Sequence, residues 1–165
     1  LRMDLLATYK YPKTLQGDIT DIMLPDGRLD GILKLAVLEH VVHVEKAISE
    51  LRRVLRKDGW MVLDVPINPK KESFFCGDDG VEVRTSKCKQ HDHVWLFSVN
   101  DLLNRLEMGG FHCYQDDSSG REQMAKEGQE QACLYALRHK LISILTTRYL
   151  SFILTSTYTP SQVVS

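Results

Sequence analysis

The sequence has little imbalance of charge and no apolar run long enough to cross a bilayer. Its 21 Lys and Arg residues nearly balance its 22 Asp and Glu residues, and the two signs are interspersed. This pattern lacks the basic stripe that a phosphate backbone requires, so nucleic acid is not expected as a partner. The most apolar segment, residues 141–154, is shorter than the roughly 20 residues of a membrane span and carries Arg148. We expect no membrane span, and interpret this segment as a terminal helix that packs on another surface.

Signals for secretion and for a disulfide framework are lacking as well. The N-terminal residues show no charged start, long apolar stretch or small-residue cleavage site of a signal peptide. The four cysteines, Cys76, Cys88, Cys113 and Cys133, are widely and irregularly spaced. Without secretory signals this spacing favours reduced thiols, so we expect a cytoplasmic protein without a disulfide framework.

What the sequence does contain is an alternation of strand and helix patterns, in a chain of 165 residues that suits one domain. Apolar residues at helical spacing predict a helix over residues 43–57, ended by Asp58-Gly59. Ser98 followed by Asp101 is a capping signal that predicts a second helix, which a Gly-Gly pair ends. Strands are predicted for residues 14–19, 30–36, 60–66, 111–115 and 132–139.

This alternation predicts an α/β fold with a Rossmann-like, mostly parallel sheet and helices on both faces. The last two predicted strands are joined by a polar segment, which favours an antiparallel C-terminal hairpin at one edge. Residues 67–94 are polar and are predicted as a long loop, with a small hairpin turned at Asp79-Gly80. Residues 140–165 are interpreted as the apolar helix followed by a disordered tail.

Four phrases of the sequence point to a family. They are GDITDIMLPDGRLDGIL (17–33), VLEHV (37–41), AISELRRVLRKDGWMVLDVP (47–66) and HDHVWLFSVNDLLNRLEMGGF (91–111). In this order they resemble the later two-thirds of a class I S-adenosylmethionine (SAM) dependent methyltransferase of the type 11 kind. The resemblance implies methyl transfer from SAM to a small molecule or another acceptor, which it does not identify, with residues 1–139 forming a partial methyltransferase domain.

The resemblance also implies that the family's first strand and its glycine-rich cofactor loop belong before residue 1. That strand is central in the family's sheet, so we expect a sheet with the first strand missing and with a gap or altered pairing there. The missing loop would hold the methionine part of SAM. A chain that starts at residue 1 is therefore expected to bind SAM weakly or not at all, and to be marginally stable.

The cofactor residues are assigned by the resemblance, because ligands in such sheets lie beyond the carboxyl ends of the strands. Asp4 would hold the ribose hydroxyls, with Leu5 along the adenine. Asp18 would accept from the adenine amino group, and the backbone of Ile19 would meet the ring. On the residues alone, Asp4 can be a solvated carboxylate and Asp18 a turn carboxylate that caps local N–H groups.

The segment around VLEHV borders the family's methyl-transfer centre. The resemblance implies that Lys34 and Leu35 flank the methionine part of SAM. His40 and His93 are the candidate catalytic residues, because an imidazole titrates near neutrality and can act as a general base. Both can instead cap or pack, and Glu39 is equally ambiguous.

The long loop offers candidate substrate contacts. His91 and Asp92 precede His93 in a run that the resemblance assigns to a lid over the substrate. Arg84 matches an Arg of the family's loop, and it could hold a substrate carboxylate or pair with a neighbouring glutamate. Cys88, His91 and His93 also suggest a metal site. Zinc ligands usually come as spaced pairs from two segments, however, so no metal is predicted.

Two other functions remain open on the sequence alone. One is a non-catalytic, methyltransferase-like interaction protein, which would bind a partner or dimerise through an open sheet edge or through residues 141–154. The other is a metal-dependent hydrolase that uses His91, Asp92 and His93.

Overall fold

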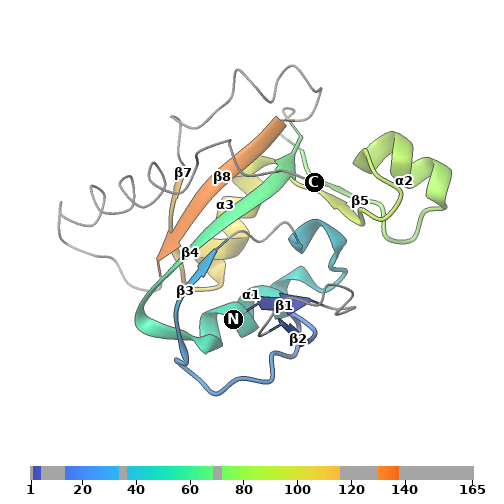
Figure 1. Cartoon of the computed structure of the whole chain (residues 1–165). Coiled ribbons are helices and arrows are strands. Elements are labelled where there is room, and N and C mark those ends of the chain that lie inside the picture. The colour runs from blue at the N-terminus through green and yellow to red at the C-terminus, as the bar shows by residue number, and fades with distance from the viewer. Residues whose placement is uncertain (1, 5–13, 34–36, 69–71, 116–129, 138–165) are drawn as a thin grey trace, which may run out of the picture.

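The computed structural model describes residues 2–4, 14–33, 37–68, 72–115 and 130–137 (Figure 1). The strands are β1 (Arg2–Asp4), β2 (Thr14–Gln16), β3 (Leu29–Leu33), β4 (Leu55–Ile67), β5 (Phe74–Phe75), β6 (Trp95–Leu96), β7 (His112–Gln115) and β8 (Glu130–Leu137). The helices are the 3-10 helix η1 (Leu38–His40), α1 (Val44–Val54), α2 (Val81–Cys88) and α3 (Val99–Met108). None of these described helices is long and apolar enough to cross a membrane.

The main sheet has the strand order β3-β4-β8-β7. β3 and β4 run parallel, with Ile32 opposite Met61, whereas β8 pairs antiparallel with both β4 and β7. The predicted α/β fold and its antiparallel C-terminal hairpin are therefore confirmed. β1 and β2 form a separate parallel pair, and no described strand joins this pair to β3. This separation matches the gap that the resemblance predicts between these strands.

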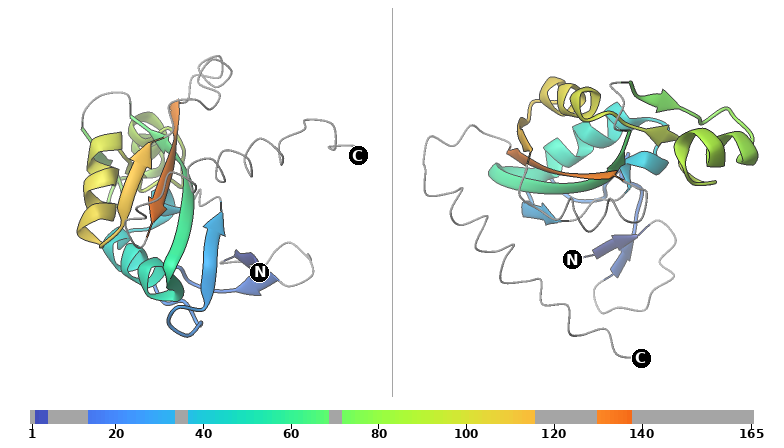
Figure 2. Two further views of the ribbon diagram at one scale, coloured as in Figure 1. Left: turned by 90° about the vertical axis from the view of Figure 1, so that its left-hand side faces the viewer. Right: turned by 90° about the horizontal axis from the view of Figure 1, so that it is seen from above.

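The core lies on one face of the main sheet, where α1 and α3 pack side by side (Figure 2). Met61, Leu63 and Val65 are spaced by two along β4, so all three point into this core and are fully buried. α3 ends so close to α1 that a Cβ on Gly109 would lie 2.4 Å from Cγ2 of Ile48. The described helices of the core, α1 and α3, cover this one face of the sheet.

The first predicted helix ends earlier than expected, at Val54. Leu55 already has extended backbone angles (φ −71°, ψ 136°), is fully buried, and lies opposite Leu29 at the start of β3. Pairing with β3 therefore begins β4 directly after the helix. The Asp58-Gly59 pair, predicted to end the helix, lies inside this strand.

The second predicted helix begins where the capping signal places it. Oγ of Ser98 accepts a hydrogen bond from the N–H of Asp101 at 3.3 Å, and α3 starts at the next residue, Val99. After its C-terminal end, Gly110 has a φ of 85°, a left-handed conformation that glycine adopts without steric cost. Local signals thus fix both ends of this helix.

The long loop predicted over residues 67–94 is in part a folded unit. β5 pairs antiparallel with β6, and α2 lies between them in the sequence; we call residues 74–96 the β5–α2–β6 unit. Asp79-Gly80 turns no hairpin, because Gly80 is the N-cap residue of α2. The connection between the two antiparallel strands, β5 and β6, instead contains the whole of α2.

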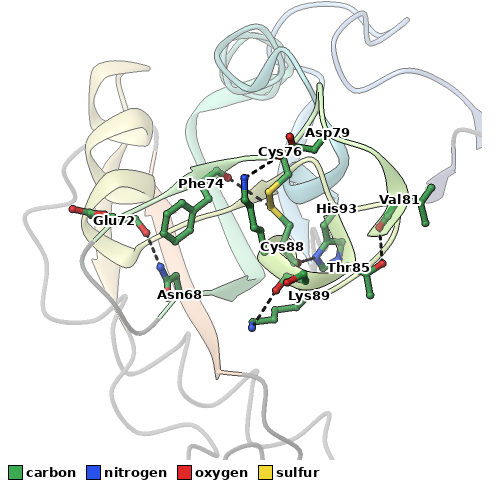
Figure 3. Close-up of a disulfide and its surroundings, with 12 residues drawn as sticks. Asn68, Glu72, Phe74, Cys76, Asp79, Val81, Thr85, Cys88, Lys89 and His93 are labelled. Carbon is green, nitrogen blue, oxygen red and sulfur yellow. Dashed lines mark hydrogen bonds and ion pairs between the residues drawn. A yellow bond between two sulfur atoms is a disulfide. The ribbon is translucent and has the colours of Figure 1, made fainter. Parts of the chain in front are cut away.

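Cys76 and Cys88 form a disulfide within this unit (Figure 3), so the expectation of reduced thiols is wrong for this pair. The N–H of Cys76 donates to the carbonyl of Val94 at 2.7 Å, which extends the β5–β6 pairing. α2 then returns Cys88, its last residue, to a Cα–Cα distance of 6.6 Å from Cys76. Cys113 is a free thiol, and burial raises its pKa to about 12.

Arg53 of α1 ties the loop between β2 and β3 to the helix. Its guanidinium donates to the carbonyl oxygens of Ile22 and Leu24, each at 2.7 Å, and to both carboxylate oxygens of Glu50 at 2.8 Å. Oε2 of Glu50 also accepts from the N–H of Ile22 at 2.8 Å. Hydrogen bonds from Arg53 lower the pKa of Glu50 to about 2. We call this arrangement the Glu50–Arg53 clamp; it holds in place the loop that carries Asp18.

We expect Glu50→Gln to lower the free energy of unfolding by about 1.5–3 kcal/mol at pH 7, because hydrogen bonds to a charged partner are weakened. The control Glu45→Gln, on the same helix, removes an exposed ion pair with Arg105 and should cost less than about 1 kcal/mol. Urea unfolding of the two variants and the wild type measures both effects.

The contribution of Glu50 should depend on pH in one direction. Its folded-state pKa lies below its ordinary value, so the contribution is complete above about pH 5 and is lost as the pH falls toward 2. The stability gap between wild type and Glu50→Gln should therefore shrink on acidification. A gap that stays constant down to the lowest pH, or equal costs for the two variants at pH 7, would contradict the clamp.

We expect replacement of both disulfide cysteines, Cys76→Ser with Cys88→Ser, to make opening of the β5–α2–β6 unit easier by about 2–4 kcal/mol, because the crosslink restricts the opened chain. Amide hydrogen exchange should rise within residues 74–96 and stay unchanged in α1 and α3. Cys113→Ser serves as the control and should leave exchange in the unit as it is. Unchanged exchange in the double variant would mean that the disulfide does not hold the unit together.

Candidate functional site

The carboxyl ends of the parallel strands β3 and β4 lie at one edge of the main sheet, which is where ligands bind in sheets of this kind. η1 lies just beyond β3, and the segment that contains β6 crosses the same edge. The N–H of Val94 donates to the carbonyl of Glu39 at 2.8 Å, and the N–H of Asn68, just after β4, donates to the carbonyl of Phe97 at 2.7 Å. These bonds bring His93 next to η1.

Glu39 is a buried carboxylic acid at this edge, with 3% of its surface exposed. Its Oε2 is buried and has no hydrogen-bond partner among the residues that the structure describes. Burial raises the pKa of Glu39 to about 7, and the neighbouring charges of Asp64 and Asp92 act in the same direction. An unsatisfied buried polar group costs about 1–3 kcal/mol, so such a residue calls for a functional explanation.

Two histidines face Glu39, and each holds its Nδ1 against a backbone carbonyl. Nδ1 of His40 lies 3.1 Å from the carbonyl oxygen of Asp92, and Nδ1 of His93 lies 3.0 Å from that of Cys88, beside the disulfide (Figure 3). A carbonyl can only accept, so Nδ1 carries the proton in each ring and Nε2 of the neutral ring keeps a lone pair. Burial lowers the pKa of His93, which favours its neutral form.

The three side chains form one group, the Glu39–His40–His93 cluster. Nε2 of His40 lies 3.9 Å from Oε1 of Glu39, and the two imidazole rings meet edge to face with centroids 4.8 Å apart. One nitrogen or oxygen atom from each of the three residues lies within 4.8 Å of the others. His93 is buried, whereas a third of the His40 side chain is exposed, so solvent reaches the cluster along His40.

The residues that the sequence suggested as substrate contacts are Arg84, His91 and Asp92, and none of them belongs to this cluster. Asp92 contributes its backbone carbonyl to His40, and its carboxylate lies 3.6 Å from the same ring. His91 is exposed and is not one of the residues of the cluster. Arg84 lies on α2, where its Nε is buried and has no partner among the described residues, and no ion pair joins it to the neighbouring Glu82.

Asp18, the candidate adenine ligand, lies just after β2 and makes a local turn. Its Oδ1 accepts from the N–H of Thr20 at 2.7 Å and from the Thr20 hydroxyl at 2.9 Å. The backbone hydrogen bond from Thr20 is the main cause that lowers the pKa of Asp18, so this exposed carboxylate is ionised at neutral pH. Ile19 next to it is buried in the core, with its backbone at the same strand end.

The remaining cofactor candidates are only partly within the described residues. Asp4 is the last residue of β1, parallel to β2, so its position at a strand end is as predicted from the sequence. Leu5, Lys34 and Leu35 lie outside the described residues, as does the segment 140–165.

An aromatic stack that the sequence did not predict holds β6 beside the site. The ring of Trp95 stacks on Phe97 with centroids 5.4 Å apart and tilts against Phe75 at 4.8 Å. The guanidinium of Arg105, from α3, lies 4.7 Å from the centroid of the Trp95 ring. Of the three cluster residues, Glu39 is the one that the sequence left ambiguous, although it directly precedes a candidate catalytic histidine.

Comparisons with known proteins give a partial family match and a shared fold. Residues 3–63 match the model of a family described as a methyltransferase domain. A curated relative is the mitochondrial 2-methoxy-6-polyprenyl-1,4-benzoquinol methylase of Oryza sativa subsp. japonica, which is 30% identical over 101 residues. The match covers 61% of this chain and 30% of that protein, so the chain spans under a third of this relative's length.

Several solved structures share the fold at lower identity. The YcgJ protein from Bacillus subtilis superposes with a TM-score of 0.56 at 14% identity, covering 78% of this chain and 71% of that chain. The 1,6-didemethyltoxoflavin-N1-methyltransferase of Burkholderia thailandensis, solved with 1,6-didemethyltoxoflavin and S-adenosylhomocysteine bound, gives a TM-score of 0.55 at 16% identity, covering 75% and 49%. The family match and the shared fold agree with the sequence motifs. Over residues 3–63 the chain is similar in sequence to a methyltransferase domain, and its fold is that of these solved structures.

Proposed function

We propose that this chain is part of a SAM-dependent methyltransferase that methylates a small molecule, with the acceptor bound against the Glu39–His40–His93 cluster. The observation that carries this proposal is the grouping of a buried carboxyl and two imidazoles beyond the carboxyl ends of β3 and β4, with Nδ1 of each imidazole held by a backbone carbonyl. The rice relative and the Burkholderia enzyme are both named for small-molecule acceptors, which supports an acceptor of the same kind here.

The chemistry of methyl transfer explains why such a cluster is useful. A lone pair of the acceptor forms a bond to the methyl carbon while the S–CH3 bond of the sulfonium breaks, and its electron pair stays on sulfur as S-adenosylhomocysteine leaves. A hydroxyl or amine acceptor must also lose a proton. We propose that His40 and His93, with Glu39, act on the acceptor by taking up that proton or by easing its loss. Asp92 orients His40 through its carbonyl.

On the cofactor side, the proposal places SAM along the strand ends that precede the cluster. The ionised carboxylate of Asp18 can accept from the adenine amino group, and its loop is held by the Glu50–Arg53 clamp. The further residues proposed for SAM binding follow the family resemblance: Asp4, Leu5, Ile19, Lys34 and Leu35. Arg84 and His91 are proposed to contact the acceptor from the β5–α2–β6 unit and the turn after it.

We expect Asp18→Ala to weaken SAM binding at least several-fold, because a hydrogen bond to a charged group is worth about 1.5–3 kcal/mol. Isothermal titration calorimetry with SAM measures the change. Asp21→Ala is the matched control: Asp21 is an exposed carboxylate in the same turn, bridged to Asp18 through the backbone, and the proposal gives it no contact with SAM.

Asp18→Asn separates a ligand role from a structural one. The amide keeps an Oδ1 acceptor for Thr20 but removes the charge, so the turn should persist while SAM affinity falls. Equal SAM binding by wild type, Asp18→Ala and Asp21→Ala would show that Asp18 only shapes the turn. A wild-type protein that binds no SAM would overturn the proposed cofactor for this chain.

A further inference from the structure

The carboxyl of Glu39 is grouped with the imidazoles of two histidines, with one ligand atom of each residue within 4.8 Å of the others, and its buried Oε2 is unpartnered among the described residues. We propose that Glu39, His40 and His93 form a binding site for a divalent transition-metal cation. The cation would bind one carboxylate oxygen of Glu39 and Nε2 of each imidazole. Only 3% of the surface of Glu39 is exposed, and its Oε2 has no partner among the described residues. A cation bound to the carboxylate would compensate for the water that this group has lost.

The orientation of the imidazoles is the strongest argument for this site. Metal-binding histidines usually donate the other ring N–H to a carbonyl or carboxylate, which fixes the tautomer and points the free nitrogen at the metal. Both histidines do so here, with Nδ1 of His40 on the carbonyl of Asp92 and Nδ1 of His93 on the carbonyl of Cys88. The carboxylate of Asp92, 3.6 Å from Nδ1 of His40, adds a second partner of this type.

The distances between the donor atoms are close to the distances between ligand atoms around a bound cation. Ligands bonded at 2.0–2.2 Å lie roughly 3.3–3.6 Å apart around a tetrahedral cation. Nε2 of His40 is 3.9 Å from Oε1 of Glu39, and the donor atoms of all three residues lie within 4.8 Å of one another. Small side-chain rotations would draw them to bonding distance, and the exposed edge of His40 gives a cation access from solvent.

The donor set also indicates which cations fit. Imidazole nitrogens suit Zn²⁺, Fe²⁺, Co²⁺ and Ni²⁺, whereas Mg²⁺ and Ca²⁺ prefer sites made of oxygen ligands alone. Three protein ligands leave an open coordination position, as in catalytic zinc sites. That position could take an oxygen of the acceptor and lower its pKa, so that its proton leaves to solvent. This extension to the acceptor rests on the proposed function, whereas binding of the cation does not.

This site differs from the one that the sequence suggested and set aside. Cys88 is consumed by the disulfide and offers only its carbonyl, to His93. His91 is exposed and does not belong to the cluster. Only His93 is common to both sets, and its partners in the structure come from η1, more than fifty residues earlier in the chain.

Titration of the protein with Co²⁺, followed by visible absorption and by calorimetry without SAM or acceptor, tests the proposal. We expect one equivalent of Co²⁺ to bind with the d–d bands of nitrogen and oxygen ligation, without a thiolate charge-transfer band, and Zn²⁺ but not Mg²⁺ to displace it. His40→Gln and Glu39→Gln should each weaken binding at least tenfold. His112→Gln, which removes an exposed imidazole on β7, is the control and should bind as the wild type does.

His40 is a third exposed, so His40→Gln should fold, and circular dichroism checks this before the titration. Absence of saturable Co²⁺ binding by the wild type would overturn the site. So would unchanged affinity in folded His40→Gln and Glu39→Gln, or a loss of affinity in His91→Gln equal to theirs. None of these outcomes affects SAM binding, which the Asp18 variants test separately.

Discussion

The burial of the Glu39 carboxyl is the constraint on which the candidate site depends. An acid in η1, beyond the carboxyl end of β3 and with 3% of its surface exposed, is costly unless a ligand, a proton or a cation compensates for the lost water. The surrounding contacts hold Glu39 in this buried position. Its backbone carbonyl accepts a hydrogen bond from the N–H of Val94, and the neighbouring His40 and His93 each hold Nδ1 against a backbone carbonyl. This cost of burial is therefore concentrated at the place where we propose that the methyl acceptor binds.

Two separate supports hold the two sides of the site. On the proposed cofactor side, the Glu50–Arg53 clamp secures the loop that carries Asp18 through the carbonyls of Ile22 and Leu24. On the proposed acceptor side, the β5–α2–β6 unit precedes His93, and its disulfide ends at Cys88, the residue whose carbonyl contacts Nδ1 of that histidine. The first support belongs to the core of the domain. The second is a small unit with its own crosslink, so we expect it to open locally without unfolding of the main sheet.

The sequence predicts those parts of the fold that local signals determine. The Ser98 cap and the glycines after α3 set that helix, and the mostly apolar run of residues 60–66 locates the second half of β4. Local sequence does not predict the end of α1 at Val54, because the helix ends where Leu55 pairs with Leu29 of the distant strand β3. The Cys76–Cys88 disulfide could not be predicted either. The two cysteines are brought together by α2 and by the pairing of β5 with β6, and these short elements lie in a polar stretch without a clear pattern.

The candidate site shows the same division. His40, Asp92 and His93 follow from the sequence phrases, but their grouping around Glu39 arises from contacts between segments more than fifty residues apart.

A crystal structure with S-adenosylhomocysteine bound would test the proposed placement of the cofactor most directly. We expect adenine beside Asp18 and Ile19, with the sulfur directed at the Glu39–His40–His93 cluster. A sulfur atom that faces away from this cluster, or a ligand bound off the carboxyl edge of the strands, would contradict it.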